Sequence, residues 1–137
     1  MTAIRIAKEG YPAIVGPSLA SRSKIEVCMA DFKTAGVLKK SGVKVAITMD
    51  HPVSRIQFLP LCGALAAKEG IGEKNAIKAI TIDAAKICGV EDRLGSLKVG
   101  KDADIALFNK NPLKISTDLF MTIINGEVVW RNNKIHQ

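Results

Sequence analysis

The segment from Val43 to Pro52 constrains the fold more than any other, because an apolar run ends there in a carboxylate, an imidazole and a proline. Valine, alanine and isoleucine with little polar alternation predict a strand that is covered on both faces, as in parallel α/β sheets. Active sites of such sheets gather at the carboxyl ends of the strands. Pro52 cannot donate a backbone hydrogen bond, so strand pairing is expected to end there. Asp50 and His51 are therefore expected at a rim, where an ordinary Asp cap of the loop is the alternative interpretation.

A parallel β/α unit is predicted around this strand. Residues 2–9 fit the end of a helix that Gly10 terminates, and the helix is followed by a short buried strand over residues 12–16. After a serine-rich loop, a helix is predicted over residues 27–40, and the next strand over residues 43–48. A strand, a crossover helix and a second strand predict parallel pairing with a right-handed crossover.

Three short helices are predicted after Pro52. Pro60 suits the first turn of a helix that runs to Glu69, and a second helix begins near Glu73. Asp83 is expected to cap the third helix, which ends at Gly89.

The last part of the sequence changes to a β pattern. A short strand and turn are predicted over residues 95–101, a stronger strand over residues 103–108, and a hairpin over residues 122–130. The hairpin prediction depends on Asn125-Gly126, because both central residues of a type I′ turn need a positive φ. A boundary is therefore expected between a parallel α/β part and a small antiparallel part.

Composition excludes several classes of protein. The 137 residues include no apolar run near the roughly 20 residues that span a bilayer, and the start of the chain does not resemble a secretory signal, so no membrane partner and a cytoplasmic location are expected. The three cysteines are widely separated among apolar neighbours, which favours reduced thiols over a disulfide framework. The net charge of +7 is scattered along the chain rather than gathered in a stripe, which disfavours a nucleic-acid partner.

Four motifs occur in an order that resembles the carboxyl-terminal part of the metal-dependent amidohydrolase superfamily, closest to its imidazolonepropionase-like and prolidase-like members. They are Thr-Met-Asp-His-Pro over residues 48–52, the Ala-Ile-Thr-Ile-Asp-Ala-Ala-Lys segment over residues 79–86, Gly-Lys-Asp-Ala-Asp over residues 100–104, and Asn-Gly at 125–126. The resemblance covers nearly the whole chain. Asp83, where many members have Asn followed by Pro, departs from the pattern.

The resemblance implies an α/β fold made of the last strands and helices of a β/α barrel (TIM barrel), followed by part of a small antiparallel β-sandwich. It assigns residues 1–92 to the barrel part and residues 93–137 to the sandwich part. Both parts would then lack neighbouring strands, and open strand edges favour pairing with another chain. Self-association, or association with a missing amino-terminal portion, is expected.

The resemblance also implies the chemistry. Asp50 corresponds to the aspartate at the end of the eighth barrel strand, which binds a divalent metal, expected to be zinc, and carries a proton between a metal-activated water and the leaving nitrogen. His51 is expected to face a small-molecule substrate. The implied reaction is hydrolysis of a C–N bond in an amide, cyclic amide or dipeptide-like substrate.

The ligand set that the family needs is incomplete in this sequence, because its histidines are only His51 and His136. The isolated chain is therefore expected to be a fragment of a hydrolase and inactive by itself. A non-catalytic assembly or regulatory module that retains the scaffold is the main alternative, and a basic nucleic-acid-binding domain is the third.

Overall fold

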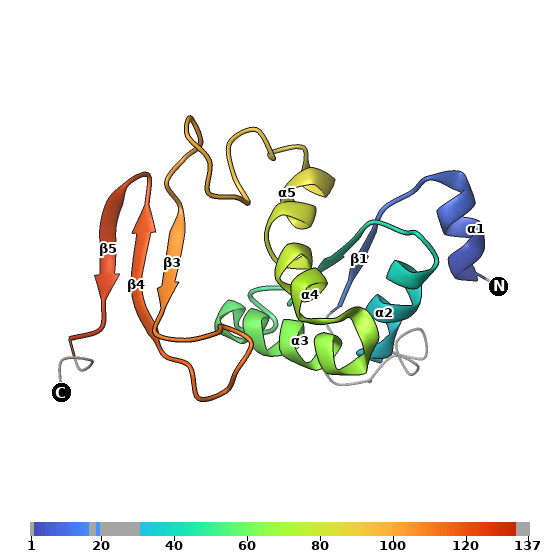
Figure 1. Ribbon diagram of the computed structural model, residues 1–137, viewed down its shortest axis with the longest axis horizontal. Helices are drawn as coiled ribbons and strands as arrows, with labels where there is room; N and C mark the ends of the chain where they lie inside the picture. Colours follow the sequence, from blue (N-terminus) through green and yellow to red (C-terminus); the bar gives the residue numbers. More distant parts are fainter. Residues whose placement is uncertain (1, 17–18, 20–30, 134–137) are drawn as a thin grey trace.

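The parallel part of the chain follows the predicted order. The computed structural model describes residues 2–16, 19 and 31–133. Its first elements are α1 (Thr2–Glu9), β1 (Ala13–Val15), α2 (Lys33–Lys40) and β2 (Val45–Ile47). The two strands are parallel neighbours, with Ala13 opposite Val45, which confirms the predicted pairing (Figure 1). Most of the serine-rich loop and the start of the predicted helix over residues 27–40 lie outside the described residues.

Strand β2 is buried along its whole length, whereas β1 is not. Val45, Ala46 and Ile47 are each at most 7% exposed, and helices α2, α3, α4 and α5 all contact β2. By contrast, Ile14 in the middle of β1 is 56% exposed, so the prediction of a buried strand is wrong at this residue. Among the described residues, four helices contact β2, whereas α2 is the main helix against β1, and Ile14 therefore lacks the cover that β2 has.

Four helical segments follow the rim, and three of them, α3, α4 and α5, contact β2. The four are α3 (Leu59–Ala66), a wider π-helical turn η3 (Ala67–Ile71), α4 (Glu73–Ala79) and α5 (Ile82–Cys88), and a short 3-10 turn η2 (Ile56–Phe58) leads into them. Pro60 lies in the first turn of α3, as predicted. The helix predicted to run to Glu69 widens at Ala67 instead, and the chain then turns at Gly70, which has a φ of 116°.

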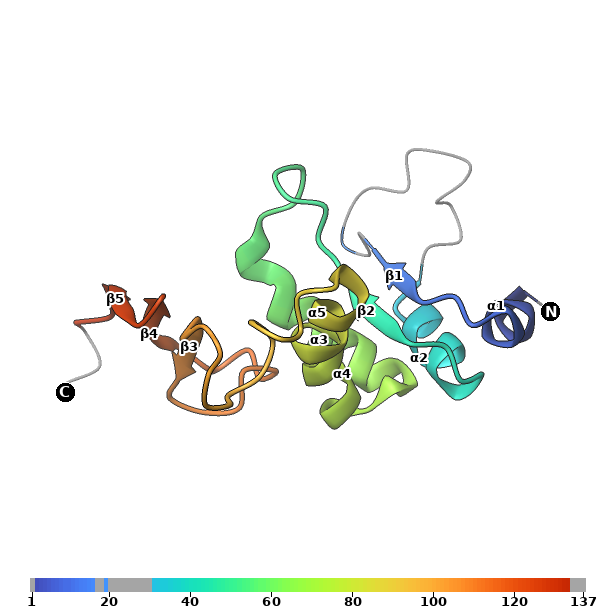
Figure 2. The ribbon, with the colours of Figure 1, turned by 90° about the horizontal axis from the view of Figure 1, so that it is seen from above.

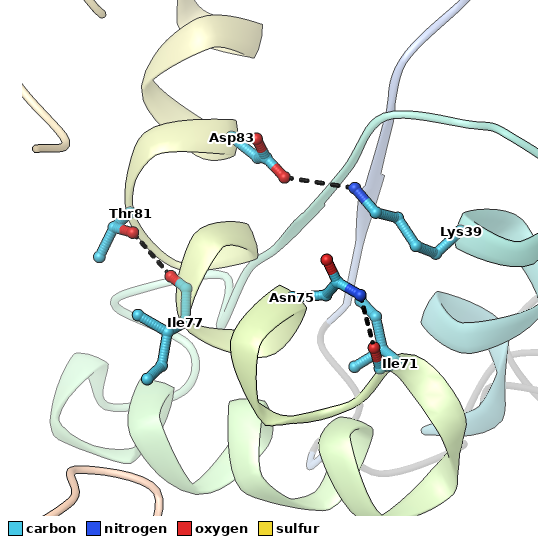
Figure 3. A network of polar contacts seen from close by, with 6 residues as sticks. All are labelled: Lys39, Ile71, Asn75, Ile77, Thr81 and Asp83. Carbon is cyan, nitrogen blue, oxygen red and sulfur yellow. Dashed lines mark hydrogen bonds and ion pairs between the residues drawn. The ribbon is translucent and has the colours of Figure 1, made fainter.

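Asp83 does not cap its helix, and the prediction that it would is wrong. Thr81 occupies the cap position of α5 without a side-chain cap hydrogen bond, and Asp83 lies inside the helix. The Asp83 side chain is largely buried and forms an ion pair with Lys39 of α2, with 3.5 Å between Nζ and Oδ2 (Figure 3). The partner of this carboxylate is thus a cation from a distant element of the chain.

Two further hydrogen bonds join the turns beside that ion pair (Figure 3). The Asn75 side-chain amide donates to the Ile71 carbonyl at 3.0 Å, and the Thr81 hydroxyl donates to the Ile77 carbonyl at 2.7 Å. These bonds occupy carbonyls near the start and the end of α4.

The carboxyl-terminal part forms an antiparallel sheet in the order β3 (Ile105–Phe108), β4 (Leu119–Ile124) and β5 (Glu127–Arg131). Asn125 and Gly126 have φ values of 51° and 81°, which confirms the predicted hairpin turn. Of the short strand and turn predicted over residues 95–101, the turn is present at Val99 and Gly100, but the strand is wrong, because no residue of this segment pairs in a sheet. The Lys101 ammonium group donates to the carbonyls of Glu91 and Leu94, so this segment is held by a side chain rather than by strand pairing.

The antiparallel sheet lies at one end of the molecule and α1 at the other, with the helices between them (Figures 1 and 2). The loop between β3 and β4 returns to the helices, where Leu113 is buried and the Asn111 amide donates to the Glu73 carboxylate at 3.1 Å. None of the helices in the described residues is long and apolar enough to cross a membrane.

Candidate active-site rim at the end of strand β2

Asp50 lies three residues beyond the end of β2 and is exposed, as the sequence predicted. Its φ of 57° is in the left-handed region, which few residues other than glycine adopt and which Asp tolerates better than most. Backbone conformations of this kind cost about 1–3 kcal/mol and cluster at functional sites. The backbone thus turns sharply at the residue whose carboxylate is the candidate ligand.

Short hydrogen-bonded turns hold the Asp50 backbone on both sides. Its N–H group lies 3.3 Å from the Thr48 hydroxyl oxygen, to which it donates, and its carbonyl accepts from the Ser54 N–H at 3.3 Å. Neither bond uses the Asp50 carboxylate, and this side chain makes no hydrogen bond or ion pair within the described ranges. Its two oxygens are therefore accessible to a ligand from outside.

The residue before Asp50 fixes the rim to the core. Met49 is 1% exposed, and the Cys62 thiol of α3 donates to its sulfur at 3.0 Å. Burial raises the pKa of the Cys62 thiol above its ordinary value, so this cysteine is a neutral core residue and a poor metal ligand. A buried side chain and an exposed one thus follow each other directly where the strand ends.

His51 is exposed next to Asp50, and its bond to Pro52 is cis. The imidazole makes no hydrogen bond or ion pair with any described residue. The structure therefore brings the two predicted site residues to the same rim but shows no direct interaction between their side chains.

These residues do not make up a metal site by themselves. No group of three or more His, Cys, Asp or Glu side chains that could hold a metal exists in the part of the chain that the structure describes. His136 lies outside the described residues. A zinc site needs at least three protein ligands, so the donors described here do not fit a complete site and Asp50 is a single exposed donor.

A groove beside the rim was not predicted from the sequence. It has a volume of about 430 Å³ and is lined by Met49 together with residues of the next turn, among them Val53, Ser54, Arg55 and Phe58. The one signal in the sequence is that an arginine, Arg55, stands among apolar residues such as Val53 and Phe58 just after Asp-His-Pro. The fold of the turn, rather than this pattern, brings these residues together.

The model of the Amidohydrolase family matches residues 30–130, and the chain therefore belongs to this family. An imidazolonepropionase from Fusobacterium nucleatum is 33% identical over 112 residues, which are 78% of this chain and 26% of that protein. The solved structure of an amidohydrolase from Thermotoga maritima MSB8 matches with a TM-score of 0.90 and 34% identity, over 96% of this chain and 34% of that one. An adenosine deaminase from Xanthomonas campestris, solved with bound zinc, shares the fold at a TM-score of 0.65 and 19% identity, over 93% of this chain and 34% of that one.

The family membership confirms the resemblance read from the ordered motifs. The chain spans about a quarter of the length of the matched imidazolonepropionase and about a third of the two solved proteins.

Proposed function

We propose that this chain is the carboxyl-terminal part of a metal-dependent hydrolase that acts on C–N bonds in amide, cyclic amide or dipeptide-like substrates. The observation that carries the proposal is the position of Asp50, an exposed carboxylate in a left-handed backbone turn at the carboxyl end of a buried parallel strand. Membership of the Amidohydrolase family supports the class of reaction.

In the complete enzyme, Asp50 contributes one carboxylate to a divalent metal and accepts and returns a proton at its Oδ atoms. The chemistry that a bound ion, proposed to be zinc, would supply at this position is a water of lowered pKa and a polarised carbonyl group. His51 lies on the same rim and faces the substrate. Because the remaining ligands must come from outside the described residues, no step of the reaction is assigned to this chain alone, and the isolated chain is inactive.

The proposed architecture follows from the same argument. Residues 1–92 supply the last strands and helices of a β/α barrel, and residues 93–137 supply part of a β-sandwich. The change from helices around a parallel pair to an antiparallel sheet supports this division (Figure 1). Both parts offer strand edges to a missing amino-terminal portion or to a second copy of the chain.

A chimera tests the catalytic role. This chain would replace the matching third of the Thermotoga maritima amidohydrolase, and hydrolysis of N-acyl amino acids, cyclic amides and dipeptides would be measured together with metal content. Asp50→Asn is expected to lower kcat by about 10³-fold, because it removes a ligand and a proton carrier. Asp92→Asn, at an exposed carboxylate in a turn, is the matched control and is expected to leave kcat unchanged. A folded chimera in which Asp50→Asn retains both metal and kcat would overturn the role of Asp50.

Metal analysis of the isolated chain tests the claim that its site is incomplete. Purified chain is expected to contain much less than one metal ion per molecule, both as the parent and as Asp50→Asn. Stoichiometric, tightly bound metal that disappears in Asp50→Asn would contradict the claim.

A non-catalytic assembly module is the second candidate, favoured by the absence of a three-ligand cluster in the described residues. It predicts that the chimera folds but does not hydrolyse any member of the substrate panel. It also predicts that a separate amino-terminal partner co-purifies with the chain.

A further inference from the structure

Asp50 keeps its left-handed backbone conformation without help from its own side chain. Aspartate is tolerated in this region because its short side chain can form a local hydrogen bond. Here the φ is 57°, yet the carboxylate makes no hydrogen bond or ion pair with any residue that the structure describes. The carboxylate is thus free for a ligand, and other groups must hold the turn.

The Thr48 hydroxyl joins this turn to the parallel sheet. The Asp50 N–H donates to the Thr48 Oγ1 atom, with 3.3 Å between nitrogen and oxygen. Thr48 is itself fixed at the end of the sheet, because its N–H donates to the Val15 carbonyl at 2.9 Å. The position of the Asp50 backbone therefore depends on a side chain that is anchored to the strand pair.

Gly16 in turn restrains the Thr48 side chain. A Cβ on Gly16 would lie 2.2 Å from the Thr48 carbonyl oxygen and 3.0 Å from its Cγ2 methyl carbon. The methyl group thus packs on the bare Gly16 backbone, in a space that a side chain would fill. Because β-branched residues have few favourable χ1 rotamers, this contact helps to hold the one in which the hydroxyl meets the Asp50 N–H.

We infer that Thr48 is a positioning residue for Asp50, and that its hydroxyl holds the turn that places the carboxylate at the rim. Its catalytic consequence rests on the proposed function, since the position of the carboxylate affects a rate only if Asp50 reacts. A neutral hydrogen bond favours one conformation over its alternatives about five-fold. Without the hydroxyl, the ratio of the left-handed conformation to the others should therefore fall by about this factor.

Two substitutions separate the hydroxyl of Thr48 from its methyl group. Thr48→Val keeps the shape and the methyl against Gly16 but removes the hydroxyl, whereas Thr48→Ser keeps the hydroxyl and removes the methyl. Positioning through the hydrogen bond predicts that Thr48→Val has the larger effect at Asp50. A role in packing alone predicts the opposite order, because valine has the shape of threonine.

NMR on the isotope-labelled chain measures the conformation of Asp50 without any metal. A positive φ brings the amide and Hα hydrogens of a residue close together, so the parent should show a strong NOE between them at Asp50. Thr48→Val is expected to weaken this NOE, and Thr48→Ser to retain most of it. Thr81→Val, the control, removes a hydroxyl that donates to the Ile77 carbonyl and should change nothing at Asp50. A well-dispersed spectrum shows that each variant is folded.

The chimera with the Thermotoga maritima amidohydrolase relates this conformation to the rate. Thr48→Val is expected to lower kcat by up to about five-fold with KM unchanged, because the displaced conformation binds substrate but does not react. Thr48→Ser should keep kcat close to that of the parent, and Thr81→Val should leave it unchanged. If the chimera does not fold, the NOE comparison in the isolated chain decides whether the hydroxyl holds the turn.

Three results would overturn the inference. They are a weak NOE at Asp50 in the parent, a larger effect of Thr48→Ser than of Thr48→Val, and an unchanged kcat of Thr48→Val in a chimera that Asp50→Asn inactivates. The third result would leave the proposed function standing. Conversely, an NOE that is lost in Thr48→Val together with a fully active Asp50→Asn chimera would keep Thr48 as the group that holds Asp50 and contradict the proposed function.

Discussion

Strands β2 and β5 have similar apolar residues and opposite surroundings. Val45, Ala46 and Ile47 of β2 are all buried, whereas every residue of β5 is exposed, including Val128 and Trp130. Helices from four segments cover β2, but the three-stranded sheet stands at one end of the molecule (Figure 1). Apolar composition therefore predicts that both segments form strands, and the elements packed against each strand determine how much it is buried.

The difference indicates which part of the chain is stable without a partner. The helical part has a contiguous core around β2, and Leu113 is the one residue of the carboxyl-terminal part that belongs to this core among the described residues. A three-stranded sheet that is largely uncovered gains little from burial of its own side chains. Substitutions in the two regions should therefore differ in cost, even when the chemical change is the same.

The largest difference in the loss of stability is expected between alanine substitutions of two glycines with positive φ. A Cβ on Gly16 would lie 2.2 Å from the Thr48 carbonyl oxygen, whereas a Cβ on Gly126 in the hairpin turn would meet nothing within 4 Å. Gly16→Ala should therefore lower the free energy of unfolding by about 3 kcal/mol, through backbone strain and a clash, and Gly126→Ala by about 1 kcal/mol, through strain alone. Urea denaturation monitored by circular dichroism measures both. Equal losses would indicate that the end of β1 rearranges freely.

A matched pair of valine substitutions, one in β2 and one in β5, compares what side-chain burial contributes to stability in the two strands. Val45→Ala removes two methyl groups from a site that is 1% exposed, and Val128→Ala removes them from a site that is 52% exposed. The expected losses are about 2 kcal/mol and less than about 0.5 kcal/mol. The single tryptophan, Trp130, lies in β5, so its fluorescence reports on the sheet while circular dichroism at 222 nm reports on the helices. A similar loss at both positions would show that the sheet is covered in solution.

The features that local chemistry determines could be predicted from the sequence. The Asn125-Gly126 hairpin follows from turn geometry, and the rim position of Asp50 follows from the end of an apolar run at a proline. The predicted cap at Asp83 was wrong because the helix already begins at Ile82, so that Asp83 lies inside it and its carboxylate pairs with Lys39, 44 residues earlier. A local pattern contains no information about such a partner.

The failures at β1 and at residues 95–101 have a similar cause. Ile14 fits a buried strand by composition, but its cover depends on elements that the described chain does not supply. The segment 95–101 has strand residues and no strand partner, and Lys101 fixes it instead. The groove beside the rim was missed because its lining residues come together only after the turn that contains them has folded.

We expect the uncovered sheet and the exposed strand edges to associate with a second copy of the chain. Val128→Lys is expected to raise the dissociation constant of the self-associated form about ten-fold, since it places a charge in an apolar contact. Val37→Lys on α2, at a site with a nearly equal exposure of 55%, is the control and should have no effect. Sedimentation velocity over a range of concentrations measures both. A parent chain that stays monomeric throughout would contradict the proposal, and a larger effect of Val37→Lys would move the contact to the helical part.

The smallest effect is expected for the pH dependence of the stability that Cys62 contributes, which tests whether the core beneath the rim excludes water. Burial raises the pKa of the Cys62 thiol, so the folded chain keeps this proton at a pH where the unfolded chain has begun to lose it. The contribution of Cys62 to stability is therefore fully present below about pH 8.5 and decreases as the pH rises through the ordinary thiol range. The stability difference between the parent and Cys62→Ala, measured by urea denaturation, should be constant from pH 6 to 8 and smaller at pH 10. A flat difference for Cys62→Ala would indicate that water reaches the sulfur, and the support that Met49 and Cys62 give to the rim would then be weaker than their burial implies.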